Sequence, residues 1–232
     1  MCLFATAASS RSTPITDGSV TTASHTRRWL VASAAIAAAV VGGAVGRNYW
    51  QTEPPPKIGG YVLSEPKPLA PVTLVDEHGR AFGPADFAGR WSFLYFGYTY
   101  CPDVCPLTLV ELATLKKRLA EQLPGTPTDY YFVSVDPRRD TPERLREYVT
   151  YFDASFHGLT GSVDDLNSLA QQTGSVFFVP EDQSDDAYLV SHSSNIALMD
   201  PEGRLSAVFT SPHDPARLAT DFGLILAYRA RR

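Results

Sequence analysis

The hydrophobic positions of the chain divide it into an uncharged N-terminal stretch and a longer C-terminal part where strand and helix patterns alternate. Residues 91–96 form a short aromatic and aliphatic run that is typical of a buried strand. Leucines then recur at spacings of three and four up to Leu123, which predicts an amphipathic helix. Similar patterns predict strands near 72–75, 81–82, 130–135, 176–179, 195–199 and 205–209, and helices from Thr141, Ser162 and Asp214.

This order of elements predicts the fold class. Strands that alternate with helices indicate a sheet with parallel members that helices cover. The C-terminal part ends in a hairpin, with its turn at residues 200–203, and a last helix. A two-cysteine loop between a central strand and a helix, followed by βαβ and ββα, is the layout of the thioredoxin fold. We therefore expect an α/β, thioredoxin-like domain over residues 71–232.

The segments before that domain have three different compositions. Residues 1–28 are rich in Ser, Thr and Ala, which predicts a disordered tail. Residues 29–46 carry no charged side chain, which favours a transmembrane anchor, although a cleaved export signal with small residues at 37–39 is an alternative. Residues 47–70 are rich in proline and predict a stiff, extended tether.

Charge predicts the orientation of that anchor. Arg27 and Arg28 precede the uncharged run, and the positive-inside rule then places the N-terminus in the cytoplasm. The C-terminal domain is thereby expected on the extracytoplasmic, periplasmic side, attached to the membrane by its N-terminal helix. The net charge of the chain is −5 and no basic stripe is present, so we expect no nucleic-acid partner.

Cys101 and Cys105 stand where the strand at 91–96 gives way to the helix. The free N–H groups of a helix N-terminus favour thiolate over thiol, and thiolates bind soft metals or attack disulfides. Two buried structural cysteines, or a structural disulfide, are the alternatives. Pro102, Asp103 and Pro106 favour an exposed loop over a core position. Three cysteines are too few for a disulfide-stapled scaffold.

Several distinctive motifs follow one another in the C-terminal part of the chain. They are Tyr95-Phe96-Gly97-Tyr98-Thr99, Cys101-Pro102-Asp103-Val104-Cys105-Pro106, Phe132-Val133-Ser134-Val135-Asp136-Pro137, Arg139-Asp140-Thr141-Pro142-Glu143, Leu159-Thr160-Gly161 and Ser191-His192-Ser193. In this order and spacing, from about Pro71 to the C-terminus, they resemble the Sco/SenC family. Members of that family are membrane-anchored, thioredoxin-fold proteins that bind copper and help to assemble the binuclear copper site of cytochrome c oxidase. The resemblance implies that Cys101, Cys105 and His192 are copper ligands. It also implies a partner, either the copper-site subunit of the oxidase or another copper or thiol protein.

The chemistry of these three side chains agrees with that implication. Two thiolates favour Cu(I), and an imidazole nitrogen lets Cu(II) be tolerated. Zinc is the competitor, because two cysteines and one histidine with an open position also match a zinc site. His192 lies far along the chain from the cysteines, and we hypothesise that a mobile third ligand lets the site open. His25, His78, His157 and His213 are expected to be solvated or structural.

Three charged residues are candidates for groups that surround the ligands. Asp103 can tune the thiols or simply favour the turn. Asp136 and Arg139 follow a strand at the end where α/β sheets place functional loops, but a turn with a helix cap explains them equally well. Two positions depart from the family pattern. Tyr100 stands where the family often has histidine, and Ser191 stands where it usually has aspartate. A carboxylate at that second position could orient the ligand histidine, so copper affinity or redox behaviour is expected to differ here.

Two functions from different classes fit these residues. A copper chaperone, or metallation factor, needs all three ligands. A thiol–disulfide oxidoreductase that reduces a partner's cysteines would use Cys101 or Cys105 as its nucleophile and has no need of His192. Thioredoxin-type reductases also place a proline before the strand that faces the cysteines, and none occurs between Pro180 and Pro201. Peroxidase activity is a third, weaker alternative. A Cys101–Cys105 disulfide is expected to abolish copper binding.

Overall fold

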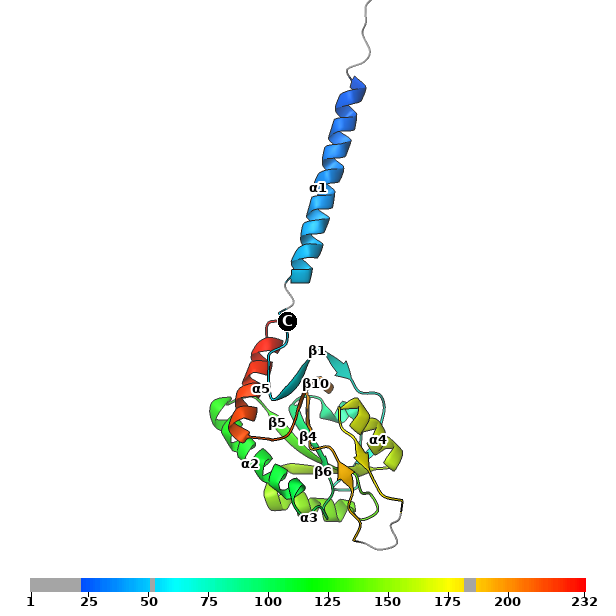
Figure 1. The fold of residues 1–232 in the computed structure, drawn as a ribbon, viewed down its shortest axis with the longest axis vertical. Coiled ribbons are helices and arrows are strands. Elements are labelled where there is room, and N and C mark those ends of the chain that lie inside the picture. The colour runs from blue at the N-terminus through cyan, green and yellow to red at the C-terminus, as the bar shows by residue number, and fades with distance from the viewer. Residues whose placement is uncertain (1–21, 51–52, 182–186) are drawn as a thin grey trace, which may run out of the picture. The chain divides into compact units, whose positions relative to one another are not determined.

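The structure, a computed structural model, describes residues 22–50, 53–181 and 187–232, without the side chains of 22–27, 44, 45 and 47–50. It separates into two compact units, Met1–Glu53 and Pro54–Arg232. In the first unit, helix α1 spans Thr22–Trp50 (Figure 1). Within the described ranges, no helix is both long enough and apolar enough to cross a membrane.

Some sequence-based expectations fall on the undescribed residues. The disordered tail predicted for residues 1–28 lies mostly outside the described part of the chain, but residues from Thr22 onward belong to helix α1. Tyr49 and Trp50 follow the uncharged run, where the sequence predicts aromatic residues of a membrane interface, and their side chains are not described. The acidic, polar stretch at residues 181–186 predicts a loop, and most of it also lies outside the described residues.

The second unit is built on one eight-stranded sheet with the order β1-β10-β9-β4-β5-β6-β2-β3. Strands β4, β5 and β6 pair in parallel, and the other neighbours are antiparallel. The bounds are β1 Gly60–Pro68, β2 Leu74–Asp76, β3 Ala81–Phe82, β4 Trp91–Gly97, β5 Thr128–Ser134, β6 Phe156–Gly161, β9 Ile196–Met199 and β10 Arg204–Phe209. A short 3-10 helix follows β3, at Pro84–Phe87. The expected mixture of parallel and antiparallel strands is confirmed.

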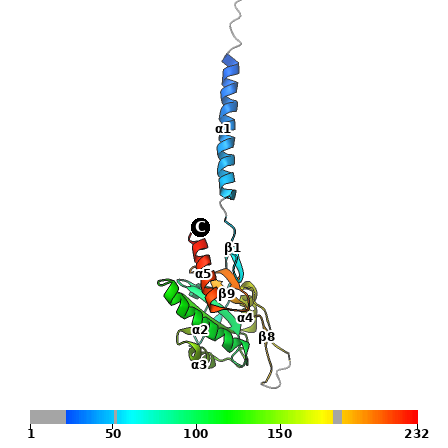
Figure 2. The ribbon, with the colours of Figure 1, turned by 60° about the vertical axis from the view of Figure 1, so that its left-hand side comes forward.

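Helices cover both faces of this sheet. They are α2 Val104–Gln122, α3 Pro142–Phe152, α4 Val163–Gln172 and α5 Pro215–Arg229. Figure 2 shows α2, α3 and α5 on one side of the sheet and α4 on the other. The predicted helix starts are confirmed, since the side chains of Thr141, Ser162 and Asp214 each accept a hydrogen bond from the backbone N–H three residues later.

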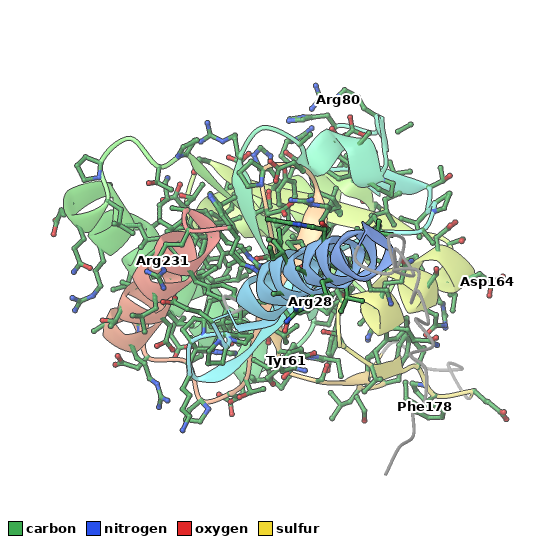
Figure 3. All side chains as sticks on the ribbon, turned by 90° about the horizontal axis from the view of Figure 1, so that it is seen from above. Arg28, Tyr61, Arg80, Asp164, Phe178 and Arg231 are labelled. Atoms are coloured by element: carbon green, nitrogen blue, oxygen red, sulfur yellow. The ribbon has the colours of Figure 1, made fainter. Side chains whose placement is uncertain are left out.

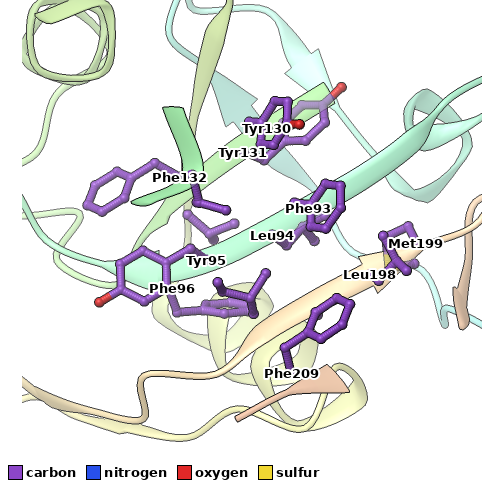
Figure 4. Close-up of a cluster of buried hydrophobic side chains, with 14 of the residues drawn as sticks. Phe93, Leu94, Tyr95, Phe96, Tyr130, Tyr131, Phe132, Leu198, Met199 and Phe209 are labelled. Carbon is purple, nitrogen blue, oxygen red and sulfur yellow. The ribbon is translucent and has the colours of Figure 1, made fainter. Parts of the chain in front are cut away.

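Strand β4 lies at the centre of the core. All seven of its residues are buried. This is expected for a strand that has neighbouring strands on both edges and is covered on both faces. Figure 4 shows aromatic side chains of β4 and β5 next to aliphatic and aromatic side chains of β9 and β10. Phe93 stacks on Tyr130 with ring centroids 5.2 Å apart. This aromatic packing holds the C-terminal end of β4 in place, directly before the cysteine loop.

Two local expectations were wrong. Residues 60–68 belong to the sheet and not to a tether, because β1 pairs with β10 along one edge, where the prolines of a strand remove no ladder hydrogen bond. The sequence patterns also missed β6, whose glycines interrupt the run of β-forming residues. A Cβ on Gly158 would lie 2.8 Å from the Leu145 Cβ, so glycine there lets α3 pack closely on β6.

A separate two-stranded sheet pairs β7 (Phe177–Phe178) with β8 (Ser191–His192). The strand predicted at residues 176–179 is therefore confirmed, with a partner that the sequence did not indicate. Phe178 projects from the periphery of the domain and is 65% exposed (Figure 3).

Candidate metal centre

The two cysteines occupy the junction between β4 and α2. Cys101 lies in the turn after β4, with its N–H hydrogen-bonded to the Tyr98 carbonyl at 3.1 Å. Cys105 lies in the first turn of α2. Both are free thiols and both are buried, 9% and 0% exposed. The expected exposed loop is wrong for the sulfur atoms, because the first turn of α2 folds back onto the end of the sheet.

A glycine makes room for the inner thiol. A Cβ on Gly97, the last residue of β4, would lie 2.8 Å from the Cys105 Sγ and 2.7 Å from the Phe132 ring. Both distances are too short for any larger side chain without movement. Gly97 belongs to one of the motifs that resemble the family, but the motif by itself did not indicate this role; the signal in the sequence is its position directly at the end of a buried strand.

His192 completes the site from β8. Its Nε2 is 3.3 Å from the Cys105 Sγ, and its Nδ1 is 3.0 Å from the Ser193 carbonyl oxygen. A carbonyl accepts only, so Nδ1–H donates to it and Nε2 carries the free lone pair, as a metal ligand requires. The two Sγ atoms and a ring nitrogen of His192 lie within 4.8 Å of one another. The fold thus brings together the three side chains that the sequence singled out.

Burial controls the charge of this group in the absence of a cation. It raises the pKa of the Cys105 thiol, and the neighbouring Cys101 adds to the effect. The expectation that the helix N-terminus would favour thiolate is therefore wrong for Cys105, since desolvation outweighs the helix dipole. Burial lowers the pKa of His192, which keeps its imidazole neutral. A soft cation would compensate both thiolates, because a coordinating thiol loses its proton outright.

Aromatic rings enclose the histidine. The rings of Tyr95 and Tyr98 meet the His192 ring edge-on, with centroids 6.1 and 6.0 Å away. Tyr95 is fully buried and Tyr98 is 2% exposed. These rings exclude water from one side of the cluster and limit how far the imidazole can rotate.

The three candidate surrounding residues occupy different places. Asp103 is exposed at the start of α2, and its side chain makes no capping hydrogen bond with the helix. Asp136 and Arg139 are buried and form an ion pair with an N–O distance of 2.5 Å. The Tyr188 hydroxyl donates to Asp136 at 2.6 Å. Asp136 and Arg139 therefore contact the chain segment that leads to His192, and neither belongs to the three-residue ligand group.

The positions that depart from the family pattern are also placed. Tyr100 is 48% exposed, and the guanidinium carbons of Arg139 and Arg144 lie 4.8 and 5.2 Å from its ring centroid. Ser191 is exposed on β8, next to the histidine. The residue before Cys101 is thus a tyrosine that packs against two arginines. A histidine at this position would offer a further nitrogen, which tyrosine does not.

The other histidines lie outside this cluster. His157 Nδ1 is 3.2 Å from a Glu77 carboxylate oxygen, and His213 Nε2 is 2.6 Å from the Ser194 carbonyl oxygen. His78 is largely exposed, with its Nε2 3.4 Å from Glu77. Of the side chains that the structure describes, only those of Cys101, Cys105 and His192 form a group of metal-ligating geometry. Cys2 and the side chain of His25 are outside the described residues.

A buried carboxylate that sequence reasoning did not assign to the site supports the cysteine loop. Asp140 is fully buried, and burial raises its pKa. It accepts hydrogen bonds from the Thr99 backbone and hydroxyl at 2.9 and 2.7 Å, and from the Ser134 hydroxyl at 2.6 Å. These bonds fix the residues directly before Cys101 to the end of β5.

Comparison with known proteins identifies the family. The SCO1/SenC family model matches residues 64–226. A protein of Stutzerimonas stutzeri, named as a candidate copper-binding protein, is 38% identical over 154 residues, which cover 65% of this chain and 73% of that protein. The human mitochondrial SCO2 homologue is 37% identical over 148 residues, covering 63% of this chain and 53% of its own. The chain thus spans about half the length of that mitochondrial relative.

Solved structures give the same answer. The copper-bound structure of Arabidopsis thaliana ScoI is 34% identical, covers 70% of this chain and 99% of its own, and has a TM-score of 0.63. Copper-bound yeast Sco1 is 31% identical, covers 68% of this chain and 87% of its own, and has the same TM-score. The mixed α/β fold is therefore the thioredoxin-like fold of these proteins, and the family model covers well over half of the chain. The chain belongs to the SCO1/SenC family.

Proposed function

We propose that this protein is a copper chaperone, or metallation factor, for the binuclear copper site of cytochrome c oxidase. Copper is its cargo, held by Cys101, Cys105 and His192. The observation that carries the proposal is the convergence of two buried thiols and a neutral imidazole within 4.8 Å, in a fold whose relatives have been solved with copper bound. SCO1/SenC membership supports the assignment to oxidase assembly.

The ligand set favours Cu(I). Two sulfurs and one nitrogen at a buried site suit a soft, three-coordinate cation, whereas Cu(II) is tolerated through the nitrogen. A structural zinc site has four protein ligands, and among the described residues no other His, Cys, Asp or Glu joins the group, so zinc remains a competitor only at a site with an open position. Copper binding must release a proton from Cys105, because burial holds that thiol protonated in the metal-free protein.

An anaerobic Cu(I) titration of the reduced full chain, with His192→Ala alongside, tests the proposal. We expect one tightly bound copper in the parent and clear weakening in the variant. Equal binding by both proteins would remove His192 as a ligand. Stoichiometric copper on the oxidised protein would contradict the expectation that a Cys101–Cys105 disulfide abolishes binding.

The second candidate function is thiol–disulfide exchange that reduces a partner's cysteines. Two free thiols side by side favour it, and Cys101 is the more exposed of the two, so it would attack a disulfide while Cys105 resolves the mixed disulfide. The absence of tight copper, together with turnover of a disulfide substrate that does not depend on His192, would support this function over the first.

Delivery further requires a partner and a compartment. The proposed acceptor is the copper-site subunit of the oxidase or another copper or thiol protein. Membrane attachment through residues 29–46, with the N-terminus cytoplasmic and the domain periplasmic, is proposed from the uncharged run and the arginines before it. Alkaline extraction of membranes tests attachment. Release of the full chain into the soluble fraction would contradict it.

A further inference from the structure

Residues 187–192 reach the metal centre as an extended arm. Along the arm, Tyr188, Val190 and His192 are at least partly buried, whereas the residues between them are exposed. This alternation has the period of a β-strand, so the three side chains face the domain together. His192 stands at one end of the arm and Tyr188 at the other. The position of the third ligand therefore depends in part on what holds Tyr188.

Tyr188 is held by a buried ion pair. Its hydroxyl donates to the Asp136 carboxylate at 2.6 Å, and Arg139 is paired with the other oxygen of the same carboxylate at 2.5 Å. The Arg139 guanidinium lies over the Tyr188 ring, 3.5 Å from its centroid, and donates to the Tyr188 carbonyl at 3.0 Å. Three contacts of different kinds thus join one residue of the arm to one ion pair at the end of β5.

The middle of the arm is buried. Val190 is 4% exposed. Beyond it, His192 pairs with Phe177 in the two-stranded sheet. Strands β7 and β8 have two residues each, so this pairing alone is a weak restraint on the arm. Ser193, directly after His192, is joined to Val176 by two hydrogen bonds of 2.9 and 3.1 Å, and the contacts of Tyr188 are the polar restraint at the other end of the arm.

We propose that Tyr188, Asp136 and Arg139 form a latch that positions His192 on the copper and thereby sets the rate at which copper leaves the site. This inference rests on the proposed function. With the latch closed, the imidazole lies 3.3 Å from the Cys105 Sγ, ready to share a cation with it. With the latch open, the arm leaves the sheet end and copper keeps only its two sulfur ligands. Retention falls in proportion to the fraction of open arm.

The latch residues are positioning residues that act through His192. None of the three belongs to the ligand group, yet each contacts another latch residue directly. A docking partner that displaces Tyr188 from the ion pair would free the imidazole without touching the cysteines. Copper would then be offered to the partner from the two thiolates, which leaves the third coordination position for a ligand of the acceptor.

Copper release from the full-length, Cu(I)-loaded protein tests the latch. Dissociation is followed as transfer to bathocuproine disulfonate under anaerobic conditions, extrapolated to zero chelator. Tyr188→Phe removes only the hydroxyl and keeps the ring over Arg139. Because a hydrogen bond to a charged group is lost, we expect roughly 10-fold faster release. Tyr188→Ala, which also loses the ring, should release copper faster still.

Two further measurements separate positioning from a general loss of structure. In the His192→Ala background, Tyr188→Phe should change the release rate by less than twofold, because the arm then carries no ligand. Tyr151→Phe is the matched control, since Tyr151 is 84% exposed on α3, and it should release copper at the parent rate. In the Cu(II) form, nitrogen hyperfine structure in the electron paramagnetic resonance spectrum should persist in Tyr188→Phe and disappear in His192→Ala.

Unchanged release from Tyr188→Phe would overturn the latch and leave the copper site intact. Equal acceleration with and without His192 would also overturn it, because Tyr188 would then act on the cysteines or on the fold. A parent protein that holds no copper at all would instead overturn the proposed function, and the latch with it.

Discussion

The two sides of the metal centre are built differently. Cys101 and Cys105 lie at the end of a fully buried strand inside an eight-stranded sheet, where a methyl group on Gly97 would meet both the Cys105 sulfur and the Phe132 ring. His192 lies on a strand of two residues, in a sheet separate from the main one. Local opening is cheapest where few apolar contacts are lost. The comparison teaches that the sulfur side is part of the core, whereas polar contacts of Tyr188 and Ser193 hold the two ends of the histidine side, which is the arrangement that the proposed latch requires.

Removing a sulfur should have the largest effect on copper. We expect Cys105→Ser to lower Cu(I) affinity by more than about 100-fold, beyond the range seen when only residues around a metal's ligands are changed. A competition titration against a chelator of known affinity measures it. Cys101→Ser should behave in the same way. Stoichiometric tight copper in either variant would show that the sulfur side is not essential.

Removing the histidine should have a smaller effect on the same scale. His192→Ala leaves both thiolates in place, and since these are the ligands that Cu(I) favours, we expect a smaller loss of affinity than in Cys105→Ser. Thermal unfolding of the metal-free variant should stay close to that of the parent, because β8 contributes little to the core. A loss as large as that of Cys105→Ser would erase the difference between the two sides.

A methyl group beside the sulfur tests whether that side is rigid. Gly97→Ala places a Cβ 2.8 Å from the Cys105 Sγ, and overpacking of this kind costs about 1–3 kcal/mol of stability. Denaturant unfolding measures it. Gly223→Ala in α5 is the control, since its Cβ would meet no atom within 4 Å, and it should stabilise the domain by up to about 1 kcal/mol. Unchanged stability in Gly97→Ala would mean that the end of β4 yields easily.

The smallest effect is expected away from the site, at the pair of Glu77 and His157. The Glu77 hydrogen bond raises the pKa of His157. Burial alone would raise the pKa of Glu77, but hydrogen bonds from His157 and from the Gly158 backbone bring it below its usual value. The His157 contribution to stability is therefore complete below its unfolded pKa and is lost as pH rises through the folded one. The Glu77 contribution is complete above its unfolded pKa and is lost as pH falls.

Unfolding free energies at about pH 6 and about pH 9 test this pair. Burial lowers the pKa values of His192 and His213, which titrate in both proteins, so the pair is read from the difference between the parent and His157→Gln. His157 is 39% exposed, so we expect the stability of the parent relative to His157→Gln to fall by less than about 1 kcal/mol on raising the pH. Copper affinity at a fixed pH should be the same in both proteins. A change in affinity would link the pair to the metal centre.

Local patterns in the sequence determined much of this protein. The apolar run of β4, the leucine spacing of α2 and the caps at Thr141, Ser162 and Asp214 specify their elements through neighbouring residues alone. The cysteine motif and the resemblance of several motifs in series indicated the family and the three side chains of the centre. Short-range spacing carries such information because it fixes the faces of helices and strands.

Tertiary structure alone decided the rest. That Cys105 is buried, and so holds its proton, follows from how α2 packs on the sheet end and reverses the expectation from the helix N-terminus. The pairing of β1 with β10 joins segments more than a hundred residues apart. The contact of Tyr188 with Asp136 and Arg139 likewise depends on how the arm crosses the end of β5. No local sequence pattern encodes these long-range contacts, because they depend on how the whole chain folds and brings distant residues together.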